Sequence, residues 1–132
     1  PYDLVGATLT GGLARRPLVL AADFGNALCG TGASEGINPT GASNPFAAGT
    51  FSGQIVVCER GVYARVEKGY NVRAAGAGGY VLVNAPADGE GLVADTHFLP
   101  AVHLGLSDGR RLAAAITAAR AAGGTLSAAI GT

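Results

Sequence analysis

The chain has 132 residues, and its nine basic and nine acidic side chains give a formal net charge of zero at pH 7. This length fits one domain with one core, and balanced charge argues against a nucleic-acid partner, because phosphate binding needs uncompensated positive charge. No apolar run approaches the roughly 20 residues that cross a bilayer, and no charged, apolar leader opens the chain, so no membrane partner is predicted. Since the first residue is Pro1 rather than Met, we expect residues 1–132 to be a single domain cut from a longer protein.

The first fifty residues predict little regular structure. Tyr2–Leu9 and Pro17–Leu20 are typical of strands separated by a Thr-Gly-Gly turn. From Gly25 to Thr50 the chain holds six glycines, two prolines and three asparagines, which predicts a loop. A loop of this length inside a compact domain is commonly either functional or disordered.

The stretch from Gly53 to Asn84 predicts a βαβ unit. The apolar runs Ile55–Val57 and Tyr80–Val83 flank a charged segment about as long as a short helix. Neither run alternates between apolar and polar residues, so both strands should be parallel and buried on both faces. We expect the helix to stop where Gly76 takes a left-handed conformation.

The intervening helix is expected to be amphipathic. Its apolar stripe, spaced by four and three residues, consists of Val62, Val66, Gly69 and Val72. The polar residues that fall largely outside this stripe are Arg65, Glu67, Lys68, Asn71 and Arg73. This pattern predicts that the polar residues face away from the sheet.

The last third of the chain predicts two short strands, one helix and a closing strand. The strands are Leu92–Ala94 and Phe98–Leu104, and Pro100 requires the second to lie at an edge or to begin pairing after the proline. Ser107 is a suitable N-cap for a helix that ends before Gly123-Gly124. Leu126–Ile130 closes the chain as a strand, which we expect to pair with Tyr2–Leu9.

Two runs of sequence resemble the protease-associated (PA) domain inserted in subtilisin-like serine proteases. They are CERGVYARVEKGYNVRAAGAGGYVLVN and GEGLVADTHFLPAVHLG. The similarity is strongest from Gly53 to Gly105, and the order of elements extends it to roughly Leu18–Ile130. It implies an α/β, β-rich fold, a curved mixed β-sandwich or open barrel with two main helices. It also implies a non-catalytic domain without a cofactor, carried in a secreted protease.

The only two cysteines are Cys29 and Cys58. From the residues alone, a disulfide and a pair of buried thiols in a reducing cytosol both stay open. Closing the loop between them would stabilise the fold by roughly 3–4 kcal/mol on the loop-entropy model. The resemblance implies the disulfide, because related inserts pair a cysteine before this strand with the cysteine that ends it.

A charged cluster follows the first βαβ strand, at the end of a parallel strand where open α/β sheets place ligands. It consists of Glu59, Arg60, Arg65, Glu67 and Lys68. One interpretation is a solvated helix face, and the other is a contact surface, since Tyr63 lies among arginines as in interface cores. The candidate partner or substrate surface is Arg60, Tyr63, Arg65, Lys68 and His97.

No catalytic or metal-binding residue is predicted. His97 and His103 are spaced to share one face of an extended strand with Asp95 nearby, but three ligands on one short strand cannot surround a metal ion. Asp88, Glu90 and Asp95 suggest at most a weak calcium site, with a solvated turn as the simpler interpretation. No serine lies in a Gly-x-Ser-x-Gly setting.

The leading hypothesis is a non-catalytic accessory domain of a secreted subtilisin-like protease. Its partners would be the catalytic domain of that protease and a polypeptide substrate or second subunit, and it would affect substrate access, protein–protein interaction or stability. One alternative is a peptide-binding PA domain of a receptor or of another protease class, such as a metallo-aminopeptidase. Another is a small cytosolic enzyme that uses Cys58 or a histidine.

Overall fold

The computed structural model describes residues 3–131. In chain order the elements are β1 (Leu13–Leu20), the 3-10 helix η1 (Ala21–Phe24), β2 (Ile55–Glu59), α1 (Arg65–Ala74), β3 (Gly79–Val83), the 3-10 helix η2 (Pro86–Asp88), β4 (Ala101–Leu104), α2 (Leu106–Ala121) and β5 (Ser127–Ile130). The segment between η1 and β2 contains turns but no helix or strand, so the loop predicted at residues 25–50 is confirmed.

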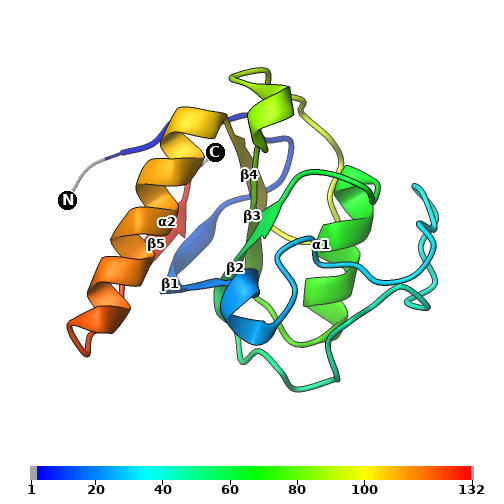
Figure 1. Ribbon diagram of the computed structural model, residues 1–132, viewed down its shortest axis with the longest axis horizontal. Coiled ribbons are helices and arrows are strands. Elements are labelled where there is room, and N and C mark those ends of the chain that lie inside the picture. The colour runs from blue at the N-terminus through cyan, green and yellow to red at the C-terminus, as the bar shows by residue number, and fades with distance from the viewer. Residues whose placement is uncertain (1–2, 132) are drawn as a thin grey trace.

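The five strands form one curled sheet in the order β4-β3-β2-β1-β5. Neighbours among β1–β4 are parallel, and β5 runs antiparallel to β1. Figure 1 shows the sheet between the two helices, with α1 on one face and α2 on the other. The predicted α/β fold, with a curved mixed sheet and two main helices, is confirmed.

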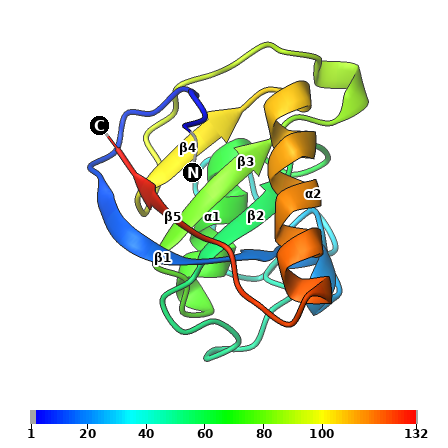
Figure 2. The ribbon, with the colours of Figure 1, turned by 90° about the vertical axis from the view of Figure 1, so that its left-hand side faces the viewer.

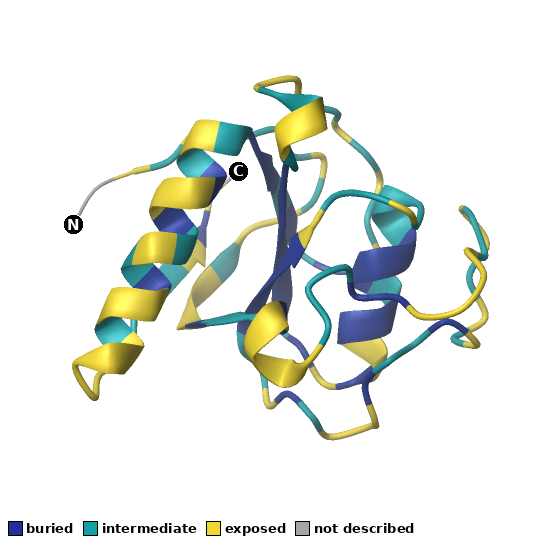
Figure 3. Ribbon diagram, viewed as in Figure 1, coloured by how far each residue is buried: buried dark blue, intermediate teal, exposed yellow. Residues whose placement is uncertain are grey.

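Each face of the sheet has its own hydrophobic cluster. Along β2, Val56 and Cys58 belong to the cluster on the α1 side, while Ile55 and Val57 belong to the cluster on the α2 side. Strand side chains alternate between faces, so a strand covered by helices on both faces is apolar throughout. Figure 3 shows these central strands as buried. The predicted βαβ unit and its two-sided burial are therefore confirmed.

The N-terminal segment differs from the prediction. Within residues 3–9 there is no strand but only an isolated bridge between Ala7 and His103, and Tyr2 lies outside the described residues. The closing strand β5 pairs with β1, which begins at Leu13. Gly6 lies so close to β4 that a Cβ there would be 2.3 Å from the carbonyl oxygen of His103. The segment therefore covers the β4 edge instead of pairing with β5.

The strand predicted at Leu92–Ala94 is also absent. By contrast, β4 begins directly after Pro100 and lies at the edge of the sheet, as the proline requires. The N-cap of α2 is Gly105 rather than Ser107. The backbone N–H of Ser107 instead donates to the carboxylate of Glu90, at 3.1 Å from Oε2.

The start of α1 and its polar face were predicted wrongly. The helix begins at Arg65, so Val62 lies in the preceding turn and is 76% exposed. Glu67, Lys68 and Asn71 are buried, because the loop of residues 25–50 folds over this side of the helix. Gly76 does take the predicted left-handed conformation, with φ of 109°. Within residues 3–131, neither helix has the length and hydropathy needed to cross a membrane.

Candidate functional site

The candidate site begins where β2 ends and the chain turns into α1. The turn contains Gly61 with φ of 137° and Val62 with φ of 61°. A β-branched residue in the left-handed region is strained, and such strain persists only where the surrounding structure holds it. Here the turn is held by Tyr63 N–H, which donates to the carbonyl oxygen of Gly61 at 2.6 Å. The result is an apolar side chain presented to solvent at the tip of the turn.

Tyr63 joins this turn to the long loop. Its hydroxyl donates to the carbonyl oxygen of Gly32 at 3.0 Å. Its ring lies against Gly30, where a Cβ would be only 2.5 Å from the ring, so this position requires glycine. The turn and the first part of the loop therefore form one continuous surface, which we call the turn–loop surface: residues 30–43 together with residues 60–63.

Lys68 lies beneath this surface rather than on it. Its ammonium group donates to the carbonyl oxygens of Leu28 at 2.7 Å and Gly61 at 2.8 Å, and lies 5.5 Å from the centre of the Tyr63 ring. Burial lowers the pKa of Lys68 to about 8, although the negative charges of Glu67 and Glu59 oppose the shift. The prediction of Lys68 as a surface contact residue is therefore corrected: it is buried and ties the loop to the turn.

Glu67 and Asn71 attach the loop to α1. One carboxylate oxygen of Glu67 accepts hydrogen bonds from the Ser34 hydroxyl and from two loop N–H groups, and the other accepts from the Ser43 hydroxyl at 2.6 Å. Burial raises the pKa of Glu67, but hydrogen bonds from Ser43, Ser34 and the loop backbone outweigh it and leave the pKa lowered. The Asn71 amide donates to the carbonyl oxygen of Cys29 at 2.9 Å.

The disulfide gives the loop a covalent attachment. Cys29 and Cys58 are bonded, with their Cα atoms 5.9 Å apart, which confirms the bridge that the resemblance implied. It joins the loop to the buried strand β2 on the face that α1 covers. The disulfide, Lys68, Glu67 and Asn71 together explain why a loop without regular structure packs in one place.

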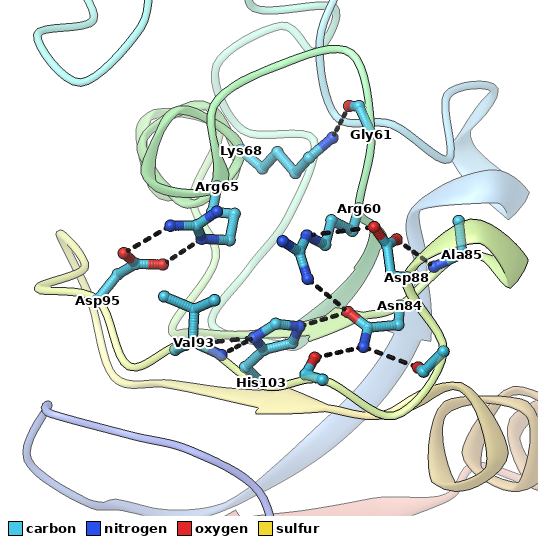
Figure 4. Close-up of polar contacts among 12 residues, drawn as sticks. Arg60, Gly61, Arg65, Lys68, Asn84, Ala85, Asp88, Val93, Asp95 and His103 are labelled. Carbon is cyan, nitrogen blue, oxygen red and sulfur yellow. Dashed lines mark hydrogen bonds and ion pairs between the residues drawn. The ribbon is translucent and has the colours of Figure 1, made fainter.

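The two arginines of the candidate surface are both paired (Figure 4). Arg65 makes two hydrogen bonds to Asp95, at 2.6 and 3.2 Å, and the hydrogen bond from Arg65 lowers the pKa of Asp95. Arg60 lies 3.6 Å from Asp88 and donates to Asn84 Oδ1 at 3.3 Å. Both guanidinium groups therefore position the segment that connects β3 to β4, and neither is an unpaired cation.

The two histidines do not share a strand as predicted. His103 lies on β4 and is buried; its Nδ1 accepts from Val93 N–H at 3.0 Å, so Nε2 donates to Asn84 Oδ1 at 2.6 Å (Figure 4). His97 precedes β4 and packs its ring against Tyr80, 5.2 Å between centres. Burial lowers the pKa of both imidazoles.

The carboxylates considered for calcium have other partners. Asp88 accepts a hydrogen bond from Ala85 N–H at 2.9 Å, and Glu90 accepts one from Ser107 N–H. Asp95 forms an ion pair with Arg65. Across residues 3–131, no group of three His, Cys, Asp or Glu side chains is arranged to hold a metal ion.

Comparison with known proteins identifies the family. A family model described as PA domain matches residues 14–112, three quarters of the chain. The chain belongs to the PA domain family. Among curated proteins, subtilisin-like protease SBT1.7 of Arabidopsis thaliana is 57% identical over 53 residues, 40% of this chain and 7% of that protein. Subtilisin-like protease SBT1.5 of the same plant is 42% identical over 85 residues, 64% of this chain and 11% of that protein.

The matched part of this PA domain thus spans only about a tenth or less of those proteases. The family assignment is consistent with a non-catalytic domain, and the disulfide removes the thiol that a cysteine-dependent enzyme would need at Cys58. The turn–loop surface exposes two apolar side chains, Val62 in the turn and Ile37 on the loop, the latter 74% exposed. Sequence periodicity missed Val62 because it assigned this residue to the buried helix stripe.

Proposed function

We propose that residues 1–132 form one accessory domain of a secreted subtilisin-like protease, and that the turn–loop surface contacts polypeptide substrates or a second subunit beside the catalytic domain. The similarity to subtilisin-like proteases supports the parent class. The disulfide supports secretion, because such bonds persist in oxidising compartments.

The proposed contact rests on the conformation and exposure of Val62. This residue is both strained, with φ of 61°, and 76% exposed, so the fold gains little from a valine there. Asparagine tolerates the left-handed region much better. Because strained backbone positions cluster at functional sites such as ligand clamps, the exposed apolar side chain is best explained by a partner that covers it. Within the turn–loop surface, Arg60 and Tyr63 are the other candidate contact residues, while Arg65 and His97 pack against Asp95 and Tyr80 outside it.

The test is Val62→Asn in the full-length protease. We expect an unchanged or higher melting temperature, because strain is relieved, together with a three- to ten-fold lower kcat/KM for a folded protein substrate and an unchanged kcat/KM for a short chromogenic peptide. A loss of roughly 1 kcal/mol of apolar contact in the transition-state complex corresponds to this range. Only the longer substrate reaches the turn–loop surface in this proposal.

Leu9→Asn serves as the control, since Leu9 is also an exposed apolar residue, at 64%, and lies outside the turn–loop surface. It should leave both substrates unaffected. Equal losses on both substrates in Val62→Asn that follow a drop in stability would make the domain a structural brace instead. Equal kcat/KM values for wild type and variant on the folded protein would remove Val62 from the proposal.

A further inference from the structure

The two edges of the sheet differ in how they are covered. At the β4 edge, Ala7 and His103 exchange backbone hydrogen bonds of 3.0 and 2.9 Å, and the Thr10 hydroxyl accepts from Ala101 N–H at 2.9 Å. At the opposite edge, β5 pairs only with β1 among residues 3–131. An edge strand without a second neighbour presents unpaired N–H and C=O groups.

The register determines which groups of β5 face outward. Leu18 N–H donates to the carbonyl oxygen of Leu126 at 2.8 Å, so these two residues form a hydrogen-bonded pair. Two residues further along, Ala128 faces β1 in the same way. Ser127 therefore directs its backbone groups away from β1, and so does Ala129, which has no partner on β1 because it lies opposite the register shift between Leu13 and Arg16. Side chains of a strand alternate between the two faces of the sheet, and those of Leu126 and Ala128 pack toward the core on the α2 side.

β5 is a short edge strand of four residues, and two common protections of such edges, proline and charged residues, are missing from it. Its sequence, Ser-Ala-Ala-Ile, contains no proline and no charged residue. Arg15 donates to the outward carbonyl oxygen of Ser127 at 3.1 Å, whereas the outward N–H and C=O of Ala129 have no partner in the described part of the chain. β5 can thus offer two donors and one acceptor to another strand.

A groove of about 580 Å³ lies along this free edge, between β5 and residues 3–8. Figure 2 shows this side of the molecule, with β5 in front of the sheet. The floor consists of aliphatic side chains from the core on the α2 side, among them Leu18, Ile55, Val81 and Leu112. The volume is comparable to that of small-molecule pockets, about 300–1,000 Å³, so the groove has room for several side chains. An occupant would need a free backbone edge and aliphatic side chains.

We propose that one extended segment of the parent protease, from outside residues 1–132, adds to the β5 edge as a further strand. Its backbone pairs with Ser127 and Ala129, and its alternate aliphatic side chains enter the groove, as in other strand additions. The proposal rests on the proposed function, since it takes the source to be the rest of the protease. The matched segments cover only 7% and 11% of the relatives, so most of such a chain lies outside this domain.

Hydrogen exchange of single amides in the full-length protease tests the strand. Ala128 N–H faces β1 and is the internal reference, while Ser127 and Ala129 N–H face outward. We expect all three amides to exchange within about ten-fold of one another once corrected for sequence. An open edge would leave the two outward amides at least about 100-fold faster, because only paired amides are protected, and that result would overturn the proposal.

Ala129→Pro provides a second test in the same protease. It removes an outward N–H that β1 does not use, and edge strands tolerate proline at such positions. We expect the exchange of Ser127 N–H to become at least ten-fold faster in Ala129→Pro, and to stay slow in the matched control Ala129→Thr, which keeps the N–H.

Other occupants give different outcomes. Protection that disappears on dilution, while light scattering shows the mass halved, would assign the edge to a second copy of the chain. Protection that requires an added polypeptide substrate would assign it to substrate. Either result would overturn the proposal. None of these exchange rates depends on the kinetics of Val62→Asn, so failure of this inference and failure of the proposed function are separate results.

Discussion

Replacing Glu67 with glutamine tests whether α1 holds the loop of residues 25–50 in place. In the wild type, Glu67 Oε1 accepts from the Ser34 hydroxyl at 2.7 Å and from the N–H groups of Glu35 and Gly36 at 3.0 and 3.1 Å. Oε2 accepts from the Ser43 hydroxyl at 2.6 Å. Glutamine keeps the size and one carbonyl oxygen but loses the negative charge and one acceptor.

The expected cost follows from these contacts. A hydrogen bond to a charged group contributes about 1.5–3 kcal/mol and a neutral one about 0.5–1.5 kcal/mol, so the three bonds at Oε1 each lose roughly 1 kcal/mol. Part of this is recovered, because a neutral amide is easier to bury than a carboxylate. We expect a net loss of about 1–2 kcal/mol in the free energy of unfolding, which lowers the melting temperature by roughly 4–8 °C.

The assay combines thermal unfolding with limited proteolysis of residues 31–43 well below the melting temperature. Cleavage of this segment should become about ten-fold faster, since each 1.4 kcal/mol of local opening changes the open population ten-fold. Glu35→Gln is the matched control: Glu35 is half-buried, and the hydrogen bonds that it accepts from residues 3–131 come from Thr40, Gly41 and Ser43 inside the loop. Its effect on unfolding should be smaller.

The same substitution changes the response to acid. The pKa of Glu67 is below its usual 4.5 in the folded chain, so its carboxylate stabilises the fold above that value, and this contribution is lost as the pH falls through the folded pKa. Glu67→Gln should remove this part of the acid sensitivity. An unchanged melting temperature together with unchanged cleavage of residues 31–43 would refute the reasoning.

Three further predictions concern other contacts. Cys29→Ala with Cys58→Ala should cost about 3–4 kcal/mol, measured by denaturant unfolding; equal stability of the reduced and oxidised wild type would contradict it. Gly76→Ala should cost more than about 2 kcal/mol, because φ is 109° and a Cβ would lie 2.1 Å from the carbonyl oxygen of Phe51; a soluble variant of wild-type stability would disprove this. Burial lowers the pKa of Lys68 to about 8, so above pH 8 this lysine binds more protons in the unfolded chain than in the folded one. The free energy of unfolding should therefore rise from pH 8 to 9.5, and Lys68→Met should lack this rise.

The sequence alone determined the centre of the fold. Ile55–Val57 and Tyr80–Val83 are continuous apolar runs because both faces of β2 and β3 are covered, and that requirement is visible in the residues themselves. Pro100 set the start of β4 because it cannot donate to a ladder. The PA family was also accessible, since its motif lies within one stretch of chain, Gly53–Gly105, and the Cys29–Cys58 disulfide followed from that resemblance.

Only the tertiary structure decided the surroundings of α1 and the free edge. Periodicity placed Glu67 and Lys68 on an exposed helix face, either solvated or in contact with a partner, yet both are buried. A long loop without regular structure must find partners for its backbone N–H and C=O groups, and here α1 supplies them from 30 to 40 residues away in sequence. The pairing of β5 with β1 rather than with residues 3–9 also depends on contacts between distant segments. Local patterns record which residues are apolar, but a backbone group's partner depends on which distant segment the folded chain brings beside it.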